Sequence, residues 1–170
     1  MTRYIALLRA VNVGGTGTLR MSDLKAICEG AGFTHVETYI ASGNVVFESQ
    51  SSAAKVKPDL ERRLRDHTGK PVKVLLRSAS EMAAVLKGNP FPNAEPEHTY
   101  AIFLDGPPPR DALTRATGQQ DEKMRLGKKV IFVRYASGMG RSKLKIPAAK
   151  DGTARNMNTV AKLVEMASKP

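Results

Sequence analysis

The sequence predicts an α+β fold of two subdomains with mixed or antiparallel sheets. The chain has 170 residues, enough for one compact domain or for two small subdomains. Its hydrophobic and charged contents, 41% and 25%, are those of a globular protein. Strand-like and helical patterns alternate, separated by turns rich in glycine and proline. The turn-rich segment 89–96 is the best boundary, so we expect subdomains at residues 1–88 and 89–170.

The first half begins with an apolar strand and a glycine-rich loop. Ser22 is a plausible N-cap for the helix that follows, and Gly32 can end it. Gly43-Asn44 reads as a two-residue hairpin turn. The predicted elements are strand 3–10, loop 11–17, helix 22–31, strands 36–42 and 45–48, helix 53–67 and strand 71–77. This β-α-β-β-α-β order predicts a ferredoxin-like subdomain.

The second half is expected to be another α+β unit of the same ferredoxin-like, βαββαβ type. Ser78 and Glu81 form a capping-box pattern at the start of a helix that stops before Asn89. The predicted elements that follow are strand 99–105, a short helix ending at residue 116, strands 121–126 and 129–135, and two helical stretches.

Positive charge is concentrated in one stretch. Residues 123–155 hold ten Lys or Arg and one acid, and so carry +9 of the chain's net charge of +11. A field of this kind indicates an anionic partner or substrate more than it indicates a reaction.

The hairpin in this stretch is predicted to turn at Gly127-Lys128. Met124, Leu126, Ile131 and Val133 then form a core face. The opposite face carries Lys123, Arg125, Phe132 and Arg134 beside Val130, the composition of a surface that binds single-stranded nucleic acid. Two alternatives stay open: the face is only solvated, or other elements cover Val130 and Phe132.

Three polar clusters lie in loops. Gly14 and Gly15 follow a strand, and backbone N–H groups there approach an anion closely. Arg141-Ser142-Lys143 follows another glycine-rich loop, and Arg155-Asn156 precedes a helix, where a guanidinium and free N–H groups favour an anion. The alternatives are a surface loop for the first cluster, and helix capping with a surface arginine for the third.

No set of residues typical of catalysis, cofactor binding or metal binding is present. His35, His67 and His98 are scattered, and Cys28 lies on an apolar helix stripe, which predicts a core residue. The question of an enzymatic activity therefore stays open. The single cysteine, the short apolar N-terminal run and the absence of a stretch of roughly 20 apolar residues lead us to expect a cytoplasmic protein without membrane contact.

Several phrases resemble a bacterial family of uncharacterised proteins, domain-of-unknown-function family 1697. They are residues 6–15, 39–47, 89–91, 141–144 and 153–163. The resemblance implies an α+β protein of two ferredoxin-like subdomains and supplies no activity. The family usually has glycine where Ala10 stands and tryptophan where Met157 stands.

These observations together lead to one main hypothesis: a pocket at polar loops between the subdomains binds a small anionic ligand, phosphorylated or nucleotide-like. The expected ligand-binding residues are Arg9, Asn12, Gly14, Gly15, Ser42, Asn44, Arg141, Ser142, Lys143, Arg155 and Asn156. Nucleic-acid binding through the hairpin face is one alternative, and a protein-interaction adaptor without a ligand is another. The oligomeric state is left open.

Overall fold

The computed structural model describes residues 1–13 and 18–169, which form two compact units. One unit contains residues 1–82 and the C-terminal residues from Leu163 onward, and the other contains residues 83–162. The sequence predicted a boundary between residues 88 and 89, which would place all residues from 89 to 170 in the second unit. One contact that holds the chain end to the first unit is the 3.0 Å bond from Arg3 Nη1 to the Ala167 carbonyl.

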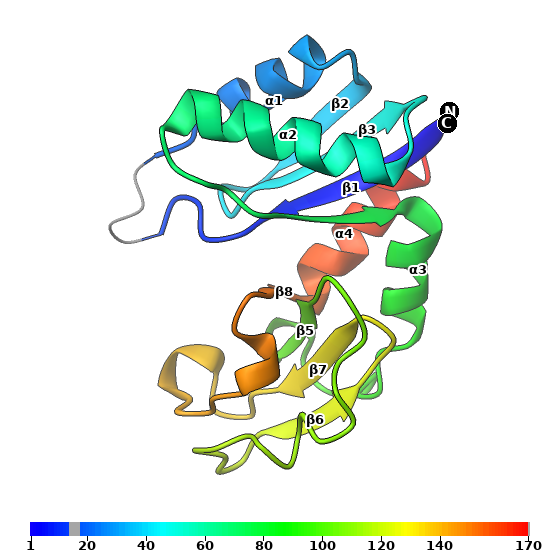
Figure 1. The fold of residues 1–170 in the computed structure, drawn as a ribbon. Coiled ribbons are helices and arrows are strands. Elements are labelled where there is room, and N and C mark those ends of the chain that lie inside the picture. The colour runs from blue at the N-terminus through cyan, green and yellow to red at the C-terminus, as the bar shows by residue number, and fades with distance from the viewer. Residues whose placement is uncertain (14–17, 170) are drawn as a thin grey trace. The chain divides into compact units, whose positions relative to one another are not determined.

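The first unit contains one antiparallel sheet with the strand order β2-β3-β1-β4. Its elements are β1 (Thr2–Leu8), α1 (Met21–Gly30), β2 (Thr34–Tyr39), β3 (Asn44–Ser49), α2 (Ala53–Thr68) and β4 (Val74–Ser78). They follow one another in the predicted order. Figure 1 shows α1 and α2 side by side on one face of this sheet.

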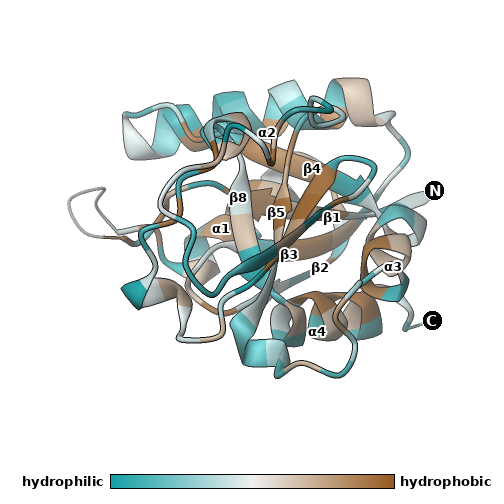
Figure 2. Cartoon of the chain, turned by 90° about the horizontal axis from the view of Figure 1, so that it is seen from below, coloured by the Kyte–Doolittle hydropathy of each residue, from teal (hydrophilic) through white to brown (hydrophobic). Residues whose placement is uncertain are grey.

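Alternate residues of the strands build the core beneath these helices. Ala6 and Leu8 of β1 are fully buried in one cluster with Leu24 of α1 and Leu60 of α2. Figure 2 shows the corresponding hydropathy: β1 and β4 are largely hydrophobic (brown), whereas α2 carries many hydrophilic residues (teal). Cys28 belongs to this cluster, and burial, followed by the Glu29 carboxylate, raises the pKa of its thiol to about 12. The prediction that Cys28 is a core residue is confirmed.

The connection between β2 and β3 differs from the predicted two-residue turn. Tyr39 pairs with Asn44, so four residues, 40–43, lie between the strands. Asn44 is itself a buried strand residue. Its side-chain Nδ2 donates to the Tyr39 carbonyl and to Ser42 Oγ, each at 2.9 Å. Gly43 has a φ of 91°, and a Cβ there would lie 2.7 Å from Val11 Cγ2. Glycine is therefore required by the close approach of the loop after β1 as well as by the turn.

The second unit contains another four-stranded antiparallel sheet, with the order β6-β7-β5-β8. Its strands are β5 (Thr99–Phe103), β6 (Lys123–Leu126), β7 (Val130–Arg134) and β8 (Thr153–Asn156). The chain passes between the two units along α3 (Ala79–Lys87) and α4 (Met157–Ala167). The predicted capping box of α3 forms: the amide of Ser78 donates to Glu81 Oε1 at 2.9 Å, and the amide of Glu81 donates to Ser78 Oγ at 3.2 Å.

Two predictions for this unit are wrong. Residues 110–115 form turns instead of a short helix, with separate bonds such as Ala112 N to the Pro109 carbonyl, 3.0 Å, and Arg115 N to the Asp111 carbonyl, 3.1 Å. Of the two helical stretches predicted at the end of the chain, the last forms as α4, and the segment directly before it is strand β8, which pairs with β5. In the described part of the chain, the only helices between β5 and β8 are 3₁₀ turns at Met139–Arg141 and Pro147–Ala149.

The β6–β7 hairpin turns one residue later than predicted. Leu126 pairs with Ile131, and the amide of Gly127 donates to the Val130 carbonyl at 2.7 Å, so Lys128 and Lys129 form the turn. The resulting two-residue shift in pairing keeps every side chain on its predicted face. A Cβ on Gly127 would lie 2.4 Å from Val130 Cγ1, so glycine is needed here for packing.

Within the described residues, no helix combines the length and the apolar character needed to cross a membrane.

Candidate functional site

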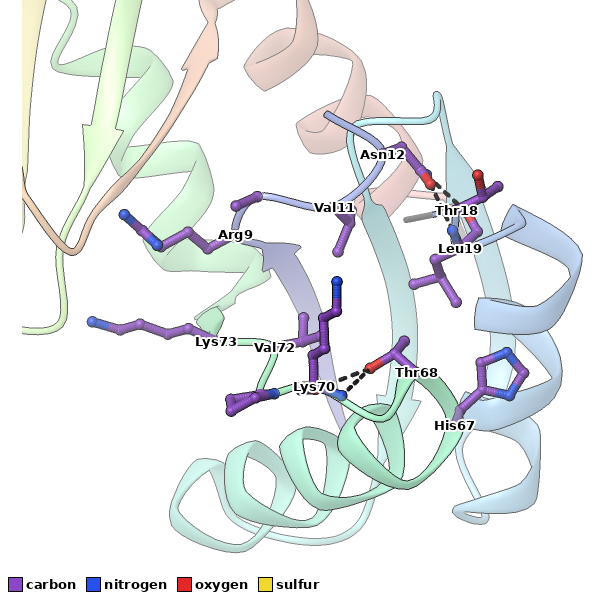
Figure 3. Close-up of a pocket in the computed structure, with 12 residues that line it drawn as sticks. Arg9, Val11, Asn12, Thr18, Leu19, His67, Thr68, Lys70, Val72 and Lys73 are labelled. Atoms are coloured by element: carbon purple, nitrogen blue, oxygen red, sulfur yellow. Dashed lines mark hydrogen bonds between the residues drawn. The ribbon is translucent and has the colours of Figure 1, made fainter. Parts of the chain in front are cut away.

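A pocket of about 610 Å³ opens in the first unit where the loop after β1 meets the segment between α2 and β4 (Figure 3). We call it the Arg9 pocket. Its lining consists of Arg9, Ala10, Val11, Asn12, Thr18, Leu19, His67, Thr68, Lys70, Pro71, Val72 and Lys73. The volume lies within the range of about 300–1,000 Å³ that is common for small-molecule sites.

One wall of the pocket is a short stretch of unusual backbone. Ala10 and Asn12 have positive φ angles, 56° and 55°, which residues with a Cβ rarely adopt. Asn12 also holds this wall in place: its Oδ1 accepts from the amide of Leu19 at 2.6 Å, and its Nδ2 donates to the Leu19 and Ala41 carbonyls, each at 2.8 Å. These bonds occupy both ends of the side chain. Asn12 therefore has a structural role in the wall, and its side-chain amide is already hydrogen-bonded to backbone groups of the protein.

The opposite wall is positioned by the end of α2. Gly69 adopts the left-handed conformation, with a φ of 77°, and its amide donates to the Arg65 carbonyl at 2.8 Å. Thr68 Oγ1 donates to the Lys70 carbonyl at 2.9 Å and accepts from its amide at 3.2 Å. This tight turn fixes the backbone of Lys70, whose side chain extends toward Val11 in Figure 3.

Cationic groups gather around the pocket. The Arg9 amide donates to the Lys73 carbonyl at 2.9 Å, and Figure 3 shows the two side chains pointing in the same direction, away from Lys70. Lys70 and His67 complete the basic set. No Asp or Glu is found among the described residues that line the pocket, and Asp23 Oδ2 lies 3.8 Å from Nε2 of the lining residue His67. The pocket therefore favours a negatively charged occupant.

The predicted ligand-binding residues of the first unit have different places. Arg9 and Asn12 line the Arg9 pocket. Asn44 is fully buried and bonded within its own hairpin loop, and Ser42 accepts from it. Gly14 and Gly15 lie outside the described residues.

In the second unit, the predicted Arg141-Ser142-Lys143 cluster lies in a loop that is hydrogen-bonded to the loop containing Glu122. Ser142 Oγ donates to Glu122 Oε2. The second carboxylate oxygen of Glu122, Oε1, accepts from the backbone amide of Gln120 at 2.7 Å. These bonds, that of Ser142 first, lower the pKa of Glu122 below its ordinary value of 4.5. Arg141 and Lys143 are exposed. Ser142 is thus engaged by the protein, whereas the two cations face solvent.

Arg155 and Asn156 are also engaged in structural contacts. Arg155 is only 7% exposed, and its Nη1 donates to Thr153 Oγ1 at 2.8 Å and to the Ala154 carbonyl at 2.9 Å. Burial lowers the pKa of its guanidinium to about 10. Asn156 caps α4, because its Oδ1 accepts from the Thr159 amide at 2.9 Å.

The hairpin face proposed for nucleic acid lacks its aromatic element. Phe132 is only 4% exposed, so its ring is not available to stack on a base, and the open alternative that this part of the face is covered is the correct one. Lys123 and Arg125 are exposed, while Arg134 is half-buried and its Nε has no hydrogen-bond partner.

The sequence did not predict the polar residues of the pocket wall between α2 and β4, namely His67, Thr68, Lys70 and Lys73. They belong to no motif and lie where a helix ends and an edge strand begins. The available signal was the strand order, because a β-α-β-β-α-β unit places the last strand beside the first. Basic residues before that strand then lie near the loop after β1.

Comparisons with known proteins agree with this fold. Residues 1–132 match the family described as "Protein of unknown function (DUF1697)". The chain is similar to the solved structure of conserved bacterial protein SP0830 from Streptococcus pneumoniae, with 28% identity, a TM-score of 0.82 and 99% of each chain covered. The comparison with curated proteins gave no match. Neither description names an activity.

Proposed function

The chain belongs to the DUF1697 family of proteins of unknown function, and we propose that it binds a small ligand with a phosphate-like anionic group in the Arg9 pocket. The observation that carries this proposal is the gathering of Arg9, Lys70 and Lys73 around one pocket whose described lining contains no carboxylate. Their attraction for an anion is strengthened where the pocket walls exclude water.

The pocket is also suited to holding a ligand without large rearrangement. The Asn12 bonds fix one wall, and the Thr68 turn at the end of α2 fixes the other. Preformed walls lower the entropy lost on binding. Val11 and Leu19 add an apolar floor, which suits a ligand with a sugar, base or short carbon skeleton beside its anionic group.

The fold of the first unit supports this location. We infer that this unit is ferredoxin-like, because its elements follow the order β-α-β-β-α-β in one antiparallel sheet with the order β2-β3-β1-β4. Loops at strand ends are common positions for binding residues on such rigid sheets. The Arg9 pocket lies at the end of β1 and the start of β4.

The test is a thermal-shift screen with inorganic phosphate, pyrophosphate and adenosine monophosphate. A saturable rise in melting temperature is expected for at least one of them. Lys70→Gln removes a cation whose side chain lies in the pocket and is expected to weaken binding about tenfold, which corresponds to roughly 1.4 kcal/mol for one charged hydrogen bond.

The matched control is Lys25→Gln, which makes the same charge change on an exposed position of α1 outside the pocket lining. It is expected to leave binding unchanged. Equal weakening by both substitutions would indicate diffuse attraction to a basic protein and would contradict a specific site.

A further inference from the structure

The second unit contains a separate pocket with a different chemical character. It has a volume of about 530 Å³, and we call it the Tyr135 pocket. Its lining is Ile102, Thr117, Tyr135, Leu144, Lys145, Ile146, Pro147, Ala149 and Lys150. We propose that it binds an amphipathic anion, namely a carboxylate with an aliphatic body of the size of a medium-chain fatty acid. This site goes beyond the proposed function, because all of its residues belong to the other unit.

The floor of the pocket is part of an apolar core. Ile102, Tyr135 and Ile146 belong to one cluster and are each 8% exposed, while Leu144 and Ala149 pack against it and stay partly exposed. These side chains offer a continuous apolar surface. Burying an aliphatic chain on it is favourable because apolar surface is removed from water.

The pocket is built by loops that are fastened to one another. Thr117 and Lys145 exchange two backbone hydrogen bonds, of 2.9 and 2.8 Å. Beside them, Gly118 lies so close to the Lys143 carbonyl that a Cβ would come within 2.1 Å of its oxygen. The Ser142 bond to Glu122 joins the same two loops again. These contacts hold together the loops that line the pocket.

Charge at the edge of this apolar surface selects the occupant. Lys145 and Lys150 line the pocket, both are exposed, and the described lining contains no Asp or Glu. Burial, followed by the Glu122 carboxylate, raises the pKa of Tyr135, and Ser142 and Gln120 bond the two oxygens of that carboxylate. The Tyr135 hydroxyl is a hydrogen-bond donor for a carboxylate.

An apolar floor and a cationic edge require both parts of an amphipathic anion. Acetate would meet the lysines and leave the floor in water. An alcohol with the same chain would cover the floor and leave Lys145 without a bound carboxylate. A medium-chain carboxylate satisfies both, and its chain fits the volume of the pocket.

The experiment is a ¹H–¹⁵N chemical-shift titration of the full chain with octanoate, acetate and 1-octanol. Octanoate is expected to give saturable shifts at the amides of Thr117, Lys145 and Ala149 and to bind at least about tenfold more tightly than either other probe. Shifts confined to other regions, no saturation, or equal binding of 1-octanol would overturn the proposal.

Two variants locate the contacts. Lys145→Gln is expected to weaken octanoate binding about tenfold, whereas Lys128→Gln, on the exposed β6–β7 turn, is expected to have no effect. Ala149→Leu should fill part of the pocket and weaken octanoate and 1-octanol alike. Unchanged octanoate affinity in Lys145→Gln would contradict the charge contact even if Ala149→Leu does not fold. Because the shifts of the two pockets map to different units, failure of one proposal is distinguishable from failure of the other.

Discussion

Asn12 bonds both the amide and the carbonyl of Leu19 through the two ends of its side chain, at 2.6 and 2.8 Å. One residue thus joins the segment that leaves β1 to the residue that leads into α1. The same Nδ2 reaches the Ala41 carbonyl at 2.8 Å and adds the β2–β3 loop to the contact. The wall of the Arg9 pocket depends on this one amide.

Replacing Asn12 by Ala should destabilise the protein by about 2 kcal/mol, because three hydrogen bonds disappear and two partly buried partners lose theirs. Urea denaturation monitored by circular dichroism would measure this loss. Asn93→Ala, on an exposed position, is the control and should change stability by less than about 0.5 kcal/mol. Similar values for the two variants would contradict the structural role of Asn12.

Replacing Ala10 by Gly should stabilise the protein. Ala10 has a φ of 56°, a conformation in which a Cβ costs roughly 1–2 kcal/mol, whereas the added freedom of glycine in the unfolded chain costs about 0.4–1 kcal/mol. A net gain of about 0.5 kcal/mol is therefore expected in thermal or urea unfolding.

The control for that substitution is Ala26→Gly, which lies on an exposed position of α1 with ordinary helical backbone. It should lower stability by about 1 kcal/mol. A loss of the same size for Ala10→Gly would show that the left-handed backbone is not under strain.

Substitutions at two glycines with similar backbone angles distinguish the cost of backbone strain from the cost of steric overlap. Gly69 and Gly118 have φ angles of 77° and 74°, but a Cβ on Gly69 meets nothing within 4 Å, whereas one on Gly118 would lie 2.1 Å from the Lys143 carbonyl oxygen. Gly69→Ala should cost about 1 kcal/mol. Gly118→Ala should cost at least about 3 kcal/mol, because the two loops of the Tyr135 pocket must separate. Equal losses in urea denaturation would contradict the close approach at Gly118.

The Ser142 bond to Glu122 predicts a pH-dependent effect. Because the folded pKa of Glu122 is lowered below 4.5, this bond stabilises the protein above that pH, and the stabilisation is lost as the pH falls through the folded pKa. Ser142→Ala should therefore be less stable than the original protein at pH 7, and the difference should shrink at acidic pH. Urea denaturation at both conditions checks this, with Ser22→Ala, on the exposed surface of α1, as the control. A difference that is independent of pH would contradict it.

Much of the first unit could be predicted because its local signals agree. Hydrophobic periodicity marked α1, α2 and the strands, and the Ser78–Glu81 capping box marked the start of α3. The second unit gave weaker signals. The four residues of β8 carry two polar groups, Thr153 and Asn156, and a buried arginine, so tertiary pairing with β5 decides their conformation.

The glycines explain why the hairpins were placed incorrectly. Gly43 and Gly127 were both interpreted as members of two-residue turns. The structure shows that close packing requires them: a Cβ on Gly43 would overlap Val11, and one on Gly127 would overlap Val130. A sequence alone does not distinguish a glycine needed for a turn from one needed for a close approach.

The site was only partly predictable for the same reason. Arg9 and Asn12 stood out because they adjoin a glycine-rich loop, although Asn12 proved to be committed to the backbone. Lys70 and Lys73 lie in no motif, and only the pairing of β4 with β1 brings them to the pocket.

The most direct test of the central claim is a ¹H–¹⁵N chemical-shift titration of the full chain with pyrophosphate. We predict saturable shifts for the backbone amides of Val11, Asn12, Lys70 and Lys73. These shifts should be lost in Lys70→Gln but not in Lys25→Gln. Small shifts that are scattered over both units and do not saturate would contradict an anion site in the Arg9 pocket.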